Sequence, residues 1–184
     1  MRTFIAIELP DTARQALAKL SRRLQACPMR ASWAKPENMH LTLRFLGDIE
    51  EPDVDTIREI LAAAYAGAES FDLDVRGTGV FPNASKPSVV WAGVVPIEGP
   101  LKRVQAAAEE AACAIGLKPE RRRFHPHVTL ARIKEPARSG SLAALLVREQ
   151  AFDGGSFSVG SVSLFSSRLD AGGAVHTRLQ EFAF

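Results

Sequence analysis

Two short motifs in the sequence combine residue types that can move protons around a phosphate. Each motif reads His-x-Thr-Leu, once at residues 40–43 and again at residues 127–130. From the content of His, Thr and Leu, chance predicts roughly 0.015 such matches in the chain, so two copies are not a coincidence. Imidazole exchanges a proton near neutral pH, and a threonine hydroxyl can donate a hydrogen bond to an anion.

In a β-strand, residues i and i+2 point to the same face of the sheet. His40 and Thr42 therefore share one face, and His127 and Thr129 do the same in the second motif. In-line displacement at phosphorus needs a base on the attacking oxygen and an acid on the leaving oxygen, and two imidazoles supply both. The threonine hydroxyls would stabilise the charge that grows on the other phosphate oxygens. This chemistry needs no metal or other cofactor, and the similarity of the motifs leaves open which imidazole is the acid.

The hydrophobic pattern predicts the strands and helices that position these motifs. Helices are predicted from Asp11, with Ala13, Leu17, Leu20 and Leu24 on one face, and from Pro52, with Val54, Ile57, Leu61 and Ala64 on one face. Further helices are expected at about 99–116 and at 141–149. Strands are predicted at 3–9, 40–47, 70–81 (one or two, interrupted by glycines), 88–95, 127–134, 155–166 and 174–183.

The order of these elements repeats. FIAIELP resembles VWAGVVP, and HLTL recurs as HVTL, at offsets of 86 and 87 residues. Two copies predict a pseudo-twofold pair of lobes, about 1–83 and 84–184, within one domain spanning 1–184. The joint is expected at Pro82–Pro87, and strands could be exchanged between the lobes. Alternating segments such as FSVGSVSLF favour mainly antiparallel sheet. We therefore expect an α+β fold with helices on the outer faces and a central cleft.

Composition excludes several classes of protein. With 46% hydrophobic and 24% charged residues and a net charge of +2, the chain is neither disordered nor broadly basic. No apolar run is long enough for a membrane helix, and MRTFIAIELP does not resemble a signal peptide. The expected location is cytoplasmic, without membrane association, and no obligate protein partner is implied.

The segments PENMHLTLRFLGDI (36–49) and FHPHVTLARI (124–133) resemble the paired signatures of the two-histidine (2H) phosphoesterase superfamily. The similarity is greatest to its RNA 2′,3′-cyclic phosphodiesterase branch, first named as bacterial 2′-5′ RNA ligases, and LFSSRL (164–169) extends it. The resemblance implies hydrolysis of a 2′,3′-cyclic phosphate to a 2′-phosphate. It implies His40 as the proton donor to the leaving 3′-oxygen and His127 as the acceptor that activates water. It also implies reversible 2′-5′ joining of RNA ends, with a 5′-hydroxyl in place of water.

Two arginines follow the motif residues. Alternation keeps Arg44 on the face of His40, within reach of a bound phosphate. Alternation places Arg132 on the face opposite His127 unless a bulge intervenes, whereas the resemblance favours a phosphate-side role for it.

The segment before the second motif carries further candidates. Arg123 ends a run of three arginines that forms either a solvated loop or a phosphate-tracking edge. His125 is expected to flank the cleft. Trp33 and Phe45 could stack a base or serve in packing. His176 departs from the family pattern, because relatives often carry tyrosine there.

Other functions stay open at this point. Each histidine could be a core residue, and His125 with His127 could ligate zinc, although no third ligand lies close in sequence. Within the same fold, the substrate could be a small cyclic nucleotide, such as a cyclic-phosphate derivative of ADP-ribose, instead of RNA. A nucleotide- or RNA-binding module without turnover is the alternative outside enzymology, but it should have lost at least one of the four motif residues.

Overall fold

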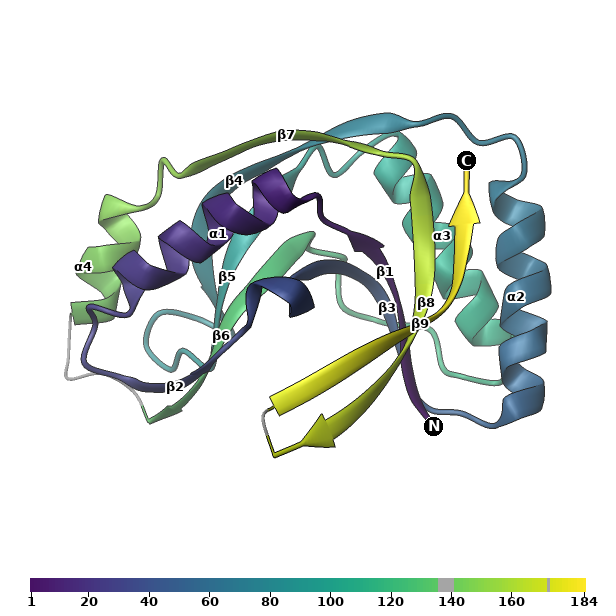
Figure 1. The fold of residues 1–184 in the computed structure, drawn as a ribbon, viewed down its shortest axis with the longest axis horizontal. Coiled ribbons are helices and arrows are strands. Elements are labelled where there is room, and N and C mark those ends of the chain that lie inside the picture. Colours follow the sequence, from purple (N-terminus) through teal and green to yellow (C-terminus); the bar gives the residue numbers. More distant parts are fainter. Residues whose placement is uncertain (136–140, 172) are drawn as a thin grey trace.

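The strands and helices alternate as expected, and the α+β class is confirmed (Figure 1). The structure is a computed structural model that describes residues 1–135, 141–171 and 173–184. The helical segments are α1 (Asp11–Leu24), η1 (a 3₁₀ turn, Pro36–Asn38), α2 (Glu51–Tyr65), α3 (Pro100–Ala114) and α4 (Ser141–Arg148). The strands are β1 (Arg2–Glu8), β2 (Arg30–Trp33), β3 (His40–Asp48), β4 (Phe71–Phe81), β5 (Val89–Val95), β6 (His127–Glu135), β7 (Asp153–Val159), β8 (Ser161–Asp170) and β9 (Gly173–Ala183).

All strand pairs in the described residues are antiparallel, and they form one curled sheet. The order is β7-β4-β5-β6-β3-β1-β8-β9, with β2 paired to β6. The strands on either side of the sheet's midpoint come from both halves of the sequence. β4, from the first half, pairs with β5 and β7, whereas β8, from the second half, pairs with β1. β3 and β6 meet at one residue pair, Leu41 with Val128.

The helices pack on one face of this sheet because the strands are apolar on that face. Leu41, Leu43, Val128 and Leu130 are buried there, in the same cluster as the apolar stripe of α1. α2 and α3 lie side by side next to β3 and β9, and α1 contacts β7 (Figure 1). The Tyr65 hydroxyl donates to the Val104 carbonyl at 2.9 Å and thereby ties α2 to α3.

Two local expectations were wrong, one strand was not expected, and the segment predicted as a joint is a hairpin loop. Tyr65 rather than Ala64 completes the buried face of α2. The segment predicted as a strand at 155–166 divides at Gly160, because β7 pairs with β4 while β8 pairs with β1. The short strand β2 was not expected. The predicted joint at Pro82–Pro87 is the loop of the β4–β5 hairpin, where the Asn83 side chain accepts from the amides of Ser85 and Lys86.

In the described ranges, no helix combines the length and apolar character that crossing a bilayer requires.

Candidate active site

The two motifs lie on adjacent antiparallel strands and are related by the pair Leu41–Val128. Extending this register by one residue in each direction places His40 beside Thr129 and Thr42 beside His127. Directly opposed residues on one face have Cβ atoms roughly 4.5–5.5 Å apart. Because the apolar motif residues are buried on one face, all four polar side chains share the opposite face. The structure thus brings both motifs into one site.

Both catalytic candidates are oriented in the same way by their own backbone. His40 Nδ1 lies 2.7 Å from the carbonyl oxygen of Asn38, and His127 Nδ1 lies 2.6 Å from that of His125. A carbonyl oxygen only accepts, so Nδ1 carries a proton in both rings. Nε2 of each ring and both threonine hydroxyls have no hydrogen-bond partner in the part of the chain that the structure describes. These four polar groups are therefore available to a ligand.

Aromatic rings surround His40. Phe4 stacks on it with ring centroids 4.6 Å apart, Phe165 lies behind Phe4, and His176 stands edge-on at 5.3 Å. Burial in this setting lowers the pKa of His40 to about 4, against the raising effect of the Asn38 carbonyl. The positive charge of Arg132, and the repulsion that protonated His176 or His127 would exert, also lower this pKa. His40 is consequently neutral at pH 7 when no ligand is bound.

A second aromatic wall stands beside His127. The rings of Phe81 and Trp91 lie 4.9 and 6.3 Å from it, and the exposed His125 packs edge-on against Trp91 at 4.7 Å. Burial lowers the pKa of His127 as well, and the nearby charges of His125 and Arg132 lower it further. These aromatic residues were not singled out from the sequence, although Trp91 pairs directly with Thr129 on the neighbouring strand.

A bulge in β6 decides where Arg132 points. Trp91 pairs with Thr129 and the preceding Val90 pairs with Ala131, so Leu130 is an extra residue. Leu130 and Ala131 are both buried, and the alternation resumes with Arg132 exposed on the face of His127. The bulge therefore supplies the condition under which the sequence allowed Arg132 to reach a phosphate.

The equivalent bulge in β3 turns Arg44 away from the site. Ala6 pairs with Thr42 and Ile5 pairs with Arg44, so Leu43 is the extra residue. The expectation that Arg44 shares the face of His40 was wrong for this reason. Its side chain is 13% exposed and lies 3.0 Å from Glu109 on α3.

The Arg44 guanidinium also donates to the Lys118 carbonyl at 2.7 Å. It thus anchors the loop that leads into the second motif. Phe45 takes the place on the His40 face, with its ring 6.0 Å from Phe4 and 54% of its surface exposed.

The remaining candidates from the sequence form no hydrogen bond, ion pair or ring contact with the motif histidines within the described residues, and they differ in their surroundings. Arg123 is exposed and makes no ion pair within the described ranges, whereas its neighbour Arg122 is bound to Glu120. Trp33 packs against the main core. Among the described residues, no group of three or more His, Cys, Asp or Glu could hold a metal ion.

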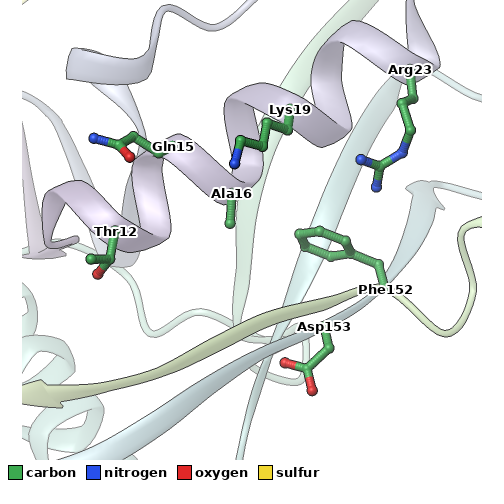
Figure 2. Close-up of a pocket in the computed structure, with 7 residues that line it drawn as sticks. All are labelled: Thr12, Gln15, Ala16, Lys19, Arg23, Phe152 and Asp153. Atoms are coloured by element: carbon green, nitrogen blue, oxygen red, sulfur yellow. The ribbon is translucent and has the colours of Figure 1, made fainter.

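A groove of about 500 Å³ lies elsewhere, between α1 and the start of β7 (Figure 2). Its lining is mixed: Gln15, Lys19 and Arg23 lie along one side of the helix, and Phe152 and Asp153 lie opposite. Arg23 is already engaged, because it forms two hydrogen bonds with Glu149 and lies over the ring of Phe152. The groove contains none of the motif residues.

Comparison with known proteins identifies the family to which the sequence is similar. The model of a family described as LigT-like phosphoesterase matches residues 7–91 and again residues 94–176. An RNA 2′,3′-cyclic phosphodiesterase of Methanothermobacter thermautotrophicus is 33% identical over 184 residues, covering 99% of this chain and 98% of the relative. One of the same name from Aeropyrum pernix is 40% identical over 145 residues, covering 79% and 81%.

Solved structures have the same fold. TT0787 of Thermus thermophilus superposes with a TM-score of 0.80 at 30% identity, covering 100% of this chain and 97% of the other. Escherichia coli LigT complexed with 3′-AMP superposes with a TM-score of 0.79, with the same coverage, and at 24% identity this likeness concerns the fold alone. On the strength of the family match along both halves of the sequence, the chain belongs to the LigT-like phosphoesterase family.

Proposed function

We propose that this protein hydrolyses 2′,3′-cyclic phosphate ends of RNA to 2′-phosphomonoesters. One observation carries the proposal: two imidazoles share a sheet face, each beside a threonine of the other motif, and their Nε2 atoms have no partner among the described residues. The names of the Methanothermobacter and Aeropyrum relatives, both RNA 2′,3′-cyclic phosphodiesterases, support this choice of substrate.

In the proposed step, water adds to phosphorus in line with the 3′-oxygen. The new P–O bond to water forms as the P–O3′ bond breaks. His127 Nε2 accepts the proton of the attacking water, and His40, protonated on Nε2, donates its proton to the leaving 3′-oxygen. The atoms balance as one water added across one bond, and proton exchange with solvent restores both rings.

The negative charge of the substrate favours protonation of His40, the proposed proton donor. Burial keeps the pKa of His40 at about 4 in the free protein. A bound phosphodiester brings a negative charge beside the ring, which favours the imidazolium and raises this pKa. Thr42, Thr129 and Arg132 would donate to the non-bridging oxygens, where charge grows in the transition state.

The same step with an RNA 5′-hydroxyl in place of water gives a 2′-5′ linkage. The acceptor oxygen would then lose its proton to His127. We include this reversible joining in the proposal, because it requires the same pair of proton transfers and no additional group.

The test uses EDTA-treated protein and an oligoribonucleotide that ends in a 2′,3′-cyclic phosphate. The expected product is a 2′-phosphate, and His40→Ala or His127→Ala should lower kcat by at least about 100-fold each. Thr12→Val, a threonine in the groove of Figure 2, is the control and should leave kcat/KM unchanged. Full activity in either histidine variant would overturn the proposal. Turnover of a small cyclic nucleotide without turnover of RNA would transfer the activity to that substrate.

A second substrate separates donor from acceptor. A phosphodiester with p-nitrophenol as leaving group needs no proton on the departing oxygen. His40→Ala should therefore recover most of the lost rate with this substrate, whereas His127→Ala should not. The reverse pattern would exchange the two roles.

A further inference from the structure

The two histidines are enclosed to different extents, and the β8–β9 hairpin makes the difference. This hairpin projects from the rest of the sheet (Figure 1). Its strand β9 brings the His176 ring edge-on to His40, with centroids 5.3 Å apart and planes at 88°. The same ring also meets Phe4 edge-on at 5.0 Å. His40 is thus held between the stacked face of Phe4 and the edge contact with His176.

Within the described residues, no strand comparable to β9 lies beside His127. β4 carries Phe81, which flanks His127, but β7 pairs with β4 only from Phe71 to Arg76. The hairpin on the other side continues past Phe165 to pair Ser167 with His176. The extra length of β8 and β9 therefore places one more ring, that of His176, against His40.

His176 sits in this contact as a neutral ring. Its Nδ1 atom is buried and has no hydrogen-bond partner within the described residues. Protonation at Nδ1 would leave a charged donor without an acceptor, which is unfavourable. In agreement, burial lowers the pKa of His176. His176 therefore contributes an aromatic surface. A role in proton transfer would require a hydrogen-bond partner for Nδ1, which the described residues do not provide.

Asn38 ties the hairpin to His40. Its side-chain amide donates to the Ala174 carbonyl on β9 at 2.7 Å, while its backbone carbonyl accepts from His40 Nδ1, also at 2.7 Å. One residue therefore fixes the orientation of the His40 ring and the position of the strand that carries His176.

We propose that His176 is a positioning residue for His40. As a neutral aromatic ring, it confines the His40 imidazole against Phe4 and excludes water from it, and the bond from Asn38 to Ala174 holds it there. This inference rests on the proposed function for its effect on turnover. The position and solvation of the His40 ring can be measured independently of that function.

The first measurement is the NMR titration of His40 in the full chain. In His176→Ala, water reaches the His40 ring, so its pKa should rise toward the ordinary value of a histidine. His176→Phe keeps the ring and should restore the low value. Thr177→Ala, at the neighbouring exposed position of β9, is the matched control and should titrate like the parent protein.

The second measurement is steady-state hydrolysis of the cyclic phosphate. His176→Ala should lower kcat by about tenfold with KM within about twofold, since a displaced proton donor loses rate more than binding. His176→Phe should recover most of kcat. Asn38→Ala, which frees the hairpin but keeps the backbone bond to His40, should act in the same direction as His176→Ala and serves as the second variant if His176→Ala does not fold.

The outcomes are distinct. An unchanged His40 titration in both His176→Ala and Asn38→Ala overturns the proposal. Equal impairment of the phenylalanine and alanine variants also overturns it, because the imidazole itself would then be required. If the parent protein hydrolyses no cyclic phosphate but the His40 titration shifts as expected, the proposed function fails and the positioning role stands.

Discussion

The lowered pKa values of the two motif histidines make a quantitative prediction about how activity depends on pH. The mechanism requires one neutral and one protonated imidazole, and the phosphodiester itself stays monoanionic throughout the accessible range. In the free protein, the pKa of His40 is about 4, and burial holds that of His127 below its ordinary value of 6.5. The singly protonated pair therefore predominates only on the acidic side of pH 6.5.

The profile of kcat/KM reports the free protein, so its two limbs should fall near pH 4 and below pH 6.5. Beyond the upper limb, kcat/KM should decrease tenfold per pH unit, which gives a loss of at least about tenfold by pH 7.5. The profile of kcat reports the complex, in which the phosphate charge favours both imidazolium forms. A charge pair at 4 Å and an effective dielectric constant near 20 interacts by about 4 kcal/mol, or about 3 pKa units.

We therefore expect the kcat profile to lie on the alkaline side of the kcat/KM profile by up to about 3 pH units. The assay is hydrolysis of an oligoribonucleotide with a 2′,3′-cyclic phosphate end between pH 4 and 9 at constant ionic strength. Circular dichroism at each pH controls for unfolding. An optimum of kcat/KM at or above pH 7, with both limbs above pH 6.5, would refute the argument that burial keeps both rings neutral.

Three further predictions follow from individual contacts. Arg132→Ala should lower kcat/KM by about 10- to 100-fold, because hydrogen bonds to charged groups contribute about 1.5–3 kcal/mol. Arg44→Ala should change kcat/KM by less than about twofold and should lower Tm. Equal losses of kcat/KM in both variants would contradict the placement of the two arginines by the bulges. The free energy of unfolding should fall by about 3 kcal/mol as pH decreases from 6.5 to 4, because the unfolded chain binds a proton that buried His40 takes up only near pH 4. His40→Asn should reduce that fall in urea titrations, and an unchanged slope would argue against it. Gly79→Ala would place a Cβ inside the indole of Trp91 and should destabilise by about 1–3 kcal/mol, read as a lower Tm, whereas an unchanged Tm would show that the ring moves freely.

Local periodicity was sufficient to predict which polar side chains of each motif share a sheet face. The period of two placed His40 with Thr42 and His127 with Thr129, and it placed their apolar neighbours in the core. The helix face of α1 was predicted correctly for the same reason, since its apolar residues recur at helical spacing. These features depend only on residues close together in sequence.

The orientations of Arg44 and Arg132 could not be predicted from the period of two. A bulge adds one residue to one strand, and the partner strand determines whether it forms. In β6, the adjacent apolar residues Leu130 and Ala131 interrupt the alternation and are a faint signal of the bulge. In β3, the corresponding position is occupied by Arg44, whose ion pair with Glu109 on α3 compensates its inward orientation. No pattern within β3 indicates that partner.

Contacts between residues far apart in the sequence could not be predicted either. His176 lies 136 residues after His40, and their rings meet because β8 pairs with β1 and carries β9 with it. β2 consists of four residues that alternate too briefly to be separated from a loop, and its pairing with β6 gives it strand geometry. Both features depend on the order of strands in the sheet.

The narrow junction between β3 and β6 has a mechanical consequence. One residue pair joins these strands, whereas seven pairs join β1 to β3. We therefore expect that a rotation of the β7-β4-β5-β6 strands relative to the β3-β1-β8-β9 strands about the Leu41–Val128 pair would break few backbone hydrogen bonds. Such a rotation changes the separation of the imidazoles, which must match the span between the attacking and leaving oxygens of a phosphate. We therefore expect the packing of the buried Leu41 and Val128 side chains to influence how far apart the two proton-transferring groups lie.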